Sequence, residues 1–187
     1  PGKQKNTAKL LLNEDADPNI DNEDGFTPLM HASYNNMIDL VHLLLRKGAD
    51  PTLTNGEERT ALEYAIVGYA DSVKQGKPKE LNIKCAEPLL HKGADPNITL
   101  NSDGLTPLMY ASHNNMTDLV KLLLSKGANP HATSSKAGGQ NRTAANYTNN
   151  PEIIKLLEEA LGTWTPRTFT VRGVPGAHDG GTPEGDY

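Results

Sequence analysis

Residues 27–51 read TPLMHASYNNMIDLVHLLLRKGADP, and residues 106–130 read TPLMYASHNNMTDLVKLLLSKGANP. The two stretches are identical at 19 of 25 positions. A weaker copy runs from Thr60 to Pro96, half a unit precedes the first copy at 9–19, and a degenerate unit follows the last at 142–160. The unit starts again after 33 residues and then after 46. Periods in this range indicate a stack of small structural repeats.

Each unit carries the signals of two short helices. Thr27 can cap the first helix, and the proline after it fits the first turn, where no N–H is needed. Asn36 tolerates the left-handed backbone of a turn between helices, and Gly48 favours the left-handed end of the second helix. Helices of about ten residues are not stable alone in water. We therefore expect the units to stack and to bury equivalent leucines, such as Leu44 and Leu123, in similar surroundings.

The chain resembles the ankyrin repeat family. The resemblance rests on G-x-T-P-L at Gly25–Leu29 and Gly104–Leu108, on L-L-L-x-x-G-A-D at Leu43–Asp50, and on the 33-residue return. It covers roughly residues 7–161. It implies an all-α solenoid in which each unit has two antiparallel helices and a β-hairpin loop. Three full repeats would then lie between partial terminal repeats.

Several positions depart from the family pattern. Met30 and Met109 stand where the family usually has the histidine of T-P-L-H, and Glu63 stands there in the middle unit. Glu58 replaces the loop glycine. The first unit lacks its inner helix, so the chain resembles a segment of a longer protein or an array capped by half a repeat.

An insertion at about 68–87 interrupts the middle repeat, and it contains a lysine-rich loop tip at 74–79. It is either a contact element or a tolerated loop, because long insertions cost little closure entropy. We expect it to lengthen the helix pair and to project from the stack. Pro88 falls inside the expected second helix, which is therefore kinked or starts near this proline.

Residues 162–187 differ from the repeat domain at 1–161 because they are rich in glycine and proline and contain no leucine. Such a segment does not build its own core. One hypothesis is that this tail docks on the repeats or on a second molecule through Trp164, Phe169 and Val171. The alternative is a linker, a tag or an appended peptide.

Catalytic and metal-binding patterns are weak. None of the six histidines forms an H-x-x-x-H pair, and the single cysteine, Cys85, is expected to be a small core residue. No acid–base pair or catalytic triad stands out. The sequence therefore predicts a chain that is not an enzyme and that uses no cofactor and no metal.

Charge and hydropathy restrict the class of partner. The net charge of −5 disfavours nucleic acid, which needs clustered lysine and arginine. Insertion into a membrane is not expected, because no run of 18 apolar residues occurs. We expect a monomer in the cytoplasm, with the nucleus, or the host cytosol for a secreted effector, as further options.

Ankyrin proteins bind partners with hairpin tips and with the exposed side of the inner helices, as the resemblance implies. Stacking places His31, Tyr64 and Tyr110 in one ladder and Tyr34, Val67 and His113 in the next. The alternative for the first ladder is half-buried packing, whereas Tyr34 and His113 are expected to be more exposed. The partner-binding candidates are Asp21, Glu23, Asp24, Phe26, His31, Tyr34, Asn35, Arg59, Tyr64, Val67, Leu105, Tyr110, His113 and Asn114.

These observations predict a non-enzymatic module that binds a partner protein or peptide on a preformed concave surface. The acidic tips favour a partner with lysine or arginine. The alternative is a regulatory or targeting region of a larger enzyme, or of a microbial effector that acts on host proteins.

Overall fold

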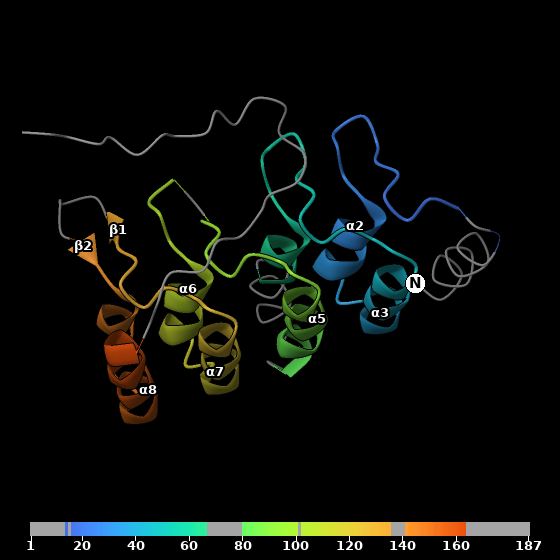
Figure 1. The fold of residues 1–187 in the computed structure, drawn as a ribbon. Helices are drawn as coiled ribbons and strands as arrows, with labels where there is room; N and C mark the ends of the chain where they lie inside the picture. The colour runs from blue at the N-terminus through green and yellow to red at the C-terminus, as the bar shows by residue number, and fades with distance from the viewer. Residues whose placement is uncertain (1–13, 15, 67–79, 101, 136–140, 164–187) are drawn as a thin grey trace, which may run out of the picture.

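The computed structural model describes residues 14, 16–66, 80–100, 102–135 and 141–163. Pairs of helices stand side by side in a row, and the loops between pairs project to one side of that row (Figure 1). The helices in chain order are α2 (Pro28–Tyr34), α3 (Ile38–Arg46), residues 61–66, α5 (Glu80–His91), α6 (Pro107–His113), α7 (Thr117–Ser125), the 3-10 helix η1 (Ala144–Tyr147) and α8 (Pro151–Thr163). The outer helices α3, α5, α7 and α8 contact one another in that order. The expected solenoid of helix pairs is therefore present.

The inner helices α2 and α6 begin at the threonine caps that the sequence predicts. The Thr27 hydroxyl accepts a hydrogen bond from the Met30 N–H at 3.3 Å, and Thr106 does the same for Met109. Prolines occupy the first turn of both helices. The Thr27 N–H in turn donates to the Met30 sulfur at 3.5 Å. Methionine thus closes a capping box at the position where the family pattern has histidine.

The turns adopt the left-handed backbone conformation that the sequence predicts. Asn36 and Asn115, between the helices of the first and third pairs, have φ of 53° and 54°, and Gly48 ends α3 with φ of 93°. Glu58 has φ of 60°, whereas Gly25 and Gly104, at the equivalent loop position, both have 75°. A side chain at this φ costs free energy that glycine avoids, so Glu58 is a strained position.

The core consists of small and aliphatic side chains from both rows of helices. Leu44 is 1% exposed and Leu123 is 0% exposed, as expected for equivalent positions of stacked units. Each fully buried leucine contributes about 1.5–3 kcal/mol to folding. Stacking of the units accounts for the stability of helices that are only 7 or 9 residues long.

Two asparagines hold loops of neighbouring units together. The Asn97 amide donates to the Gly127 carbonyl at 3.2 Å, and its oxygen accepts from the Asn129 N–H at 2.7 Å. Asn19 makes the same two bonds to Gly48 and Asp50. These contacts span about 30 residues of sequence, so repeat spacing alone did not reveal them.

The middle repeat differs from one expectation. Pro88 lies inside α5, which begins eight residues earlier at Glu80. The alternative that this helix starts near Pro88 is therefore wrong. At 12 residues, α5 is longer than the nine-residue α3 and α7, so the expected lengthening is confirmed for this helix. Residues 67–79 of the insertion lie outside the described residues.

Candidate partner-binding face

The hairpin tips are built around two asparagines. The Asn22 oxygen accepts from the backbone N–H groups of Asp24 at 3.1 Å and Phe26 at 2.8 Å. The Asn55 oxygen makes the equivalent bonds to Glu57 and Arg59, at 3.1 and 2.9 Å. Such bonds fix a turn without a longer sheet. Neither asparagine was predicted as a functional residue, although their 33-residue spacing is visible in the sequence.

The first two tips are locked together. The Gly56 N–H donates to the Asp24 carbonyl at 3.0 Å. A Cβ atom on Gly25 would lie 3.1 Å from the Asn55 Cα, so glycine permits this close approach. Farther along the stack, the Ser135 N–H makes the equivalent bond to the Asp103 carbonyl at 2.9 Å. The first tip is therefore joined to the second, and the third to the loop that follows it, and within each joined pair the backbones are held in fixed relative positions.

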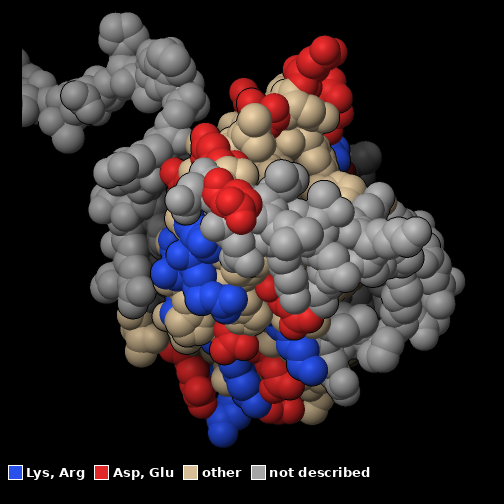
Figure 2. Space-filling view, turned by 90° about the vertical axis from the view of Figure 1, so that its right-hand side faces the viewer, with Lys and Arg blue, Asp and Glu red and all other residues tan. Residues whose placement is uncertain are grey.

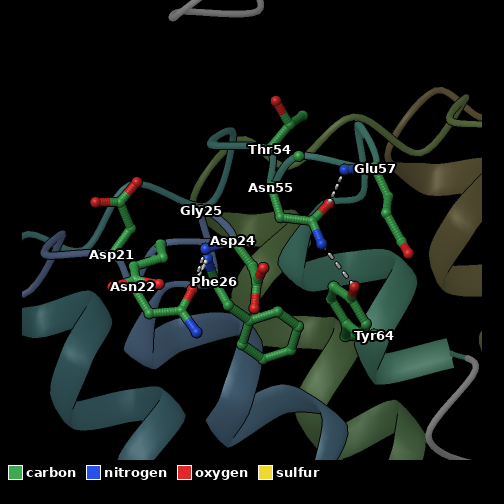
Figure 3. A pocket seen from close by; sticks show the side chains of 11 residues that line it. Asp21, Asn22, Asp24, Gly25, Phe26, Thr54, Asn55, Glu57 and Tyr64 are labelled. Atoms are coloured by element: carbon green, nitrogen blue, oxygen red, sulfur yellow. Dashed lines mark hydrogen bonds between the residues drawn. The ribbon is translucent and has the colours of Figure 1, made fainter.

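A groove of about 950 Å³ lies between the first two tips (Figure 3). Its lining joins one side of the first tip to the second tip and to the start of the next inner helix. The lining residues are Asp21, Asn22, Glu23, Asp24, Gly25, Phe26, Thr54, Asn55, Gly56, Glu57 and Tyr64. Five of the predicted partner-binding residues are thus brought into one groove, namely Asp21, Glu23, Asp24, Phe26 and Tyr64.

Aromatic rings form the floor beside this groove. The Phe26 and Tyr64 ring centroids are 4.7 Å apart, and those of Tyr34 and Tyr64 are 6.2 Å apart, both in edge-to-face arrangements. Tyr64 is only 8% exposed, and its hydroxyl accepts from the Asn55 amide at 2.9 Å. Burial raises the pKa of Tyr64. Packing is therefore the main role of this ring, which matches the alternative reading of the first ladder.

The two described members of the second predicted ladder are accessible. Tyr34 is 40% exposed at the end of α2, and His113 is exposed at the end of α6. His31 is exposed on α2, whereas Leu105 and Tyr110 are half-buried.

The predicted asparagines Asn35 and Asn114 hold helix ends. Each side-chain amide donates at 2.9 Å to a backbone carbonyl one turn earlier, that of His31 and that of Tyr110. In each residue one amide N–H is used by this bond, which stabilises the end of α2 or α6 beside the exposed ladder.

Arg59 joins two carboxylates at the second tip. Its Nε lies 3.3 Å from a Glu57 oxygen and 3.4 Å from a Glu63 oxygen. Glu63 is 4% exposed, and burial raises its pKa from 4.5 to about 6, against the opposing effect of Arg59. The charge of Arg59 is thus committed within the chain. Arg59 was predicted to bind a partner, whereas Glu63 was identified from the sequence only as a departure from the repeat pattern.

Acidic side chains gather at the tip end of the molecule. Figure 2 shows red atoms at the top, on the side where the loops project, whereas blue and red atoms are mixed lower down over the helices. Asp21, Glu23, Asp24, Glu57 and Glu58 are the carboxylates of the first two tips, and all five are exposed. This end of the molecule therefore attracts positively charged groups.

Comparison with known proteins identifies the family. The model of the family described as "Ankyrin repeats (3 copies)" matches residues 2–75 and 79–163. The chain belongs to the ankyrin repeat family. Ankyrin repeats are a non-enzymatic fold that serves in protein–protein interaction. The chain is also 36% identical over 99 residues to "Ankyrin repeat, SAM and basic leucine zipper domain-containing protein 1" of Ornithorhynchus anatinus.

The ankyrin chain matches only a part of these relatives. The match covers 53% of this chain and 19% of the Ornithorhynchus protein. The protein of the same name from Rhinolophus ferrumequinum is 32% identical over 112 residues, which is 60% of this chain and 22% of that protein. The chain therefore spans about a fifth of the length of the curated relatives it matches.

Other predictions about chemistry can be compared with the described part of the ankyrin chain. Cys85 is buried, and burial raises the pKa of its thiol to about 12, as befits a small core residue. Within the described ranges, no cluster of three or more metal-binding side chains occurs. Nor does any helix there have the length and apolar character needed to cross a bilayer. Val67 and the tail anchors Trp164, Phe169 and Val171 lie outside the described residues.

Proposed function

We propose that this ankyrin chain binds a partner protein or peptide on the face made by its hairpin tips and inner helices. The observation that carries the proposal is the exposure of Tyr34 and His113 beside loops that backbone bonds join in two pairs. A preformed surface loses little ordering entropy on binding. Tyrosine and histidine rings also combine apolar contact with hydrogen bonding, which favours them as anchors.

The class of partner follows from charge. The exposed carboxylates of the tips would repel nucleic-acid phosphates, so a protein partner is favoured over DNA or RNA. We further propose a monomer that works in the cytoplasm, which accords with a single, buried cysteine. The relatives carry, by name, SAM and leucine zipper domains beside their ankyrin repeats. A role as the targeting region of a longer protein is therefore compatible with this proposal.

The test is a capture experiment in which two double variants of the full chain serve as baits, and the proteins that each variant captures are compared. Tyr34→Ala with His113→Ala removes both exposed rings of the ladder. His42→Ala with Leu161→Ala removes two exposed side chains from the outer helix α3 and from the last helix, α8. We expect the ladder variant to lose captured proteins, with affinity lower by about 2 kcal/mol or more, while its melting temperature stays within a few degrees of the parent. Equal capture by both variants would contradict the assignment of this face.

A further inference from the structure

We propose that the groove between the first two tips binds an arginine or lysine side chain within an extended, positively charged segment of the partner. This inference rests on the proposed function, because it assigns a chemistry to one part of the same face. The groove has the size of a ligand site, about 950 Å³. Its shape is preformed, since the Gly56 bond to Asp24 and the close approach of Gly25 to Asn55 fix the two tips.

Among the described residues, no lysine or arginine forms an ion pair with the carboxylates of the first tip. The first tip contributes Asp21, Glu23 and Asp24 to the lining, and the second contributes Glu57. Arg59 is the one cation within residues 20–27 and 53–60, and it already faces two carboxylates, one of them the buried Glu63. Glu57 shares the guanidinium of Arg59 with Glu63, whereas Asp21, Glu23 and Asp24 have no described cationic partner, so a positively charged side chain from outside would meet the carboxylates of the first tip.

The aromatic floor favours an organic cation over a simple ion. Phe26 is half-exposed in the lining, and Figure 3 shows the Asp24 carboxylate beside its ring. A guanidinium or ammonium group can lie on an aromatic face while a carboxylate neutralises it. In the described part of the chain, no group of three or more His, Cys, Asp or Glu side chains is arranged to hold a metal ion. The groove therefore suits a side-chain cation better than a metal.

Hydrogen-bond donors in the lining favour a peptide as the carrier of that cation. The Tyr64 hydroxyl accepts from the Asn55 amide, which leaves its own proton to donate to a ligand. The Asn22 oxygen is occupied by two backbone N–H groups, and its amide N–H₂ remains to donate. Two donors beside a cation site can pair with the carbonyls of an extended backbone.

The probe is a short amidated peptide that carries arginine among glycine and serine, compared with the same peptide carrying glutamine instead. Binding to the full chain is followed by amide chemical shifts in NMR titrations. We expect shift changes confined to residues 21–26, 54–57 and Tyr64 with the arginine peptide only. Asp24→Asn with Glu57→Gln should raise the Kd about fivefold, and Phe26→Leu about twofold, because each replaces one part of the cation site.

A matched control removes the same charge elsewhere. Glu87→Gln with Glu158→Gln neutralises two exposed carboxylates on the outer helices α5 and α8, and the Kd should stay within about a factor of two. Equal weakening by both double variants, shift changes spread over the outer helices, or no binding of the arginine peptide would each overturn the inference. If a captured partner depends on Tyr34 and His113 but not on Asp24 and Glu57, the proposed function holds and only this inference fails.

Discussion

The buried carboxyl of Glu63 makes the stability of the stack depend on pH. Burial raises its pKa from 4.5 to about 6 in the folded chain, so the folded state binds this proton more tightly than the unfolded state. The free energy of unfolding therefore falls as the pH rises through this window. A shift of this size corresponds to about 2 kcal/mol, fully present below pH 4.5 and lost above pH 6.

Glu63→Gln removes this titration and keeps the shape of the side chain. We expect the variant to gain about 2 kcal/mol relative to the parent chain between about pH 4 and about pH 8, because its own side chain does not ionise. Urea unfolding at a series of pH values, followed by far-UV circular dichroism, measures the difference. Subtracting the parent curve from the variant curve cancels the contributions of all other titrating groups.

Glu158→Gln is the control, because it removes a carboxylate that is exposed on α8. Its effect should stay within about 0.5 kcal/mol at every pH. If the difference between the Glu63→Gln variant and the parent chain is the same in acid and in base, burial does not control the protonation of Glu63, and the reasoning is refuted.

Three further predictions concern stability, and each is measured by urea unfolding at constant pH. Glu58→Gly should stabilise the chain by about 0.5–1 kcal/mol, because glycine relieves the left-handed strain at φ of 60°. Asn97→Ala should cost about 2 kcal/mol through its two lost bonds, whereas the exposed Asn149→Ala should change little. Ser112→Ala should cost about 1 kcal/mol, because the Ser112 hydroxyl donates to the Leu108 carbonyl at 2.8 Å. Ser33→Ala should be neutral or stabilising, because the buried Ser33 hydroxyl has no hydrogen-bond partner among the described residues. Equal costs for the two serine variants would contradict this last comparison.

Local and periodic features of the fold were predictable from sequence. The threonine cap at Thr27, the left-handed Asn36 and Gly48, and the burial of Leu44 and Leu123 all follow from short-range rules or from the repeat itself. The repeat spacing shows which positions face the same way, and stacking of the units then buries the equivalent apolar side chains. The prediction of an ankyrin solenoid is confirmed on this basis.

Equivalent positions do not have equivalent neighbours, and this limits what the repeat can predict. His31, Tyr64 and Tyr110 share one repeat position, but they are exposed, buried and half-buried respectively. Tyr64 is buried because rings from the preceding unit, Phe26 and Tyr34, lie against it. The raised pKa of Glu63 likewise depends on its surroundings in the stack.

Two energetically costly residues, Glu58 in the second tip and Glu63 in the helix that follows, are sequence neighbours of the groove-lining residues Glu57 and Tyr64. Glu58 carries backbone strain, and Glu63 carries a desolvated carboxyl one turn into the following helix. Strain and buried charge are costs that persist where another role offsets them. Glu63, at 3.4 Å from the Arg59 Nε, competes with Glu57, at 3.3 Å, for the same guanidinium, and Arg59 itself is not among the residues that line the groove. Replacing Glu63 by glutamine should therefore stabilise the fold at neutral pH and yet weaken the attraction of the groove for an arginine peptide, so that stability and binding change in opposite directions.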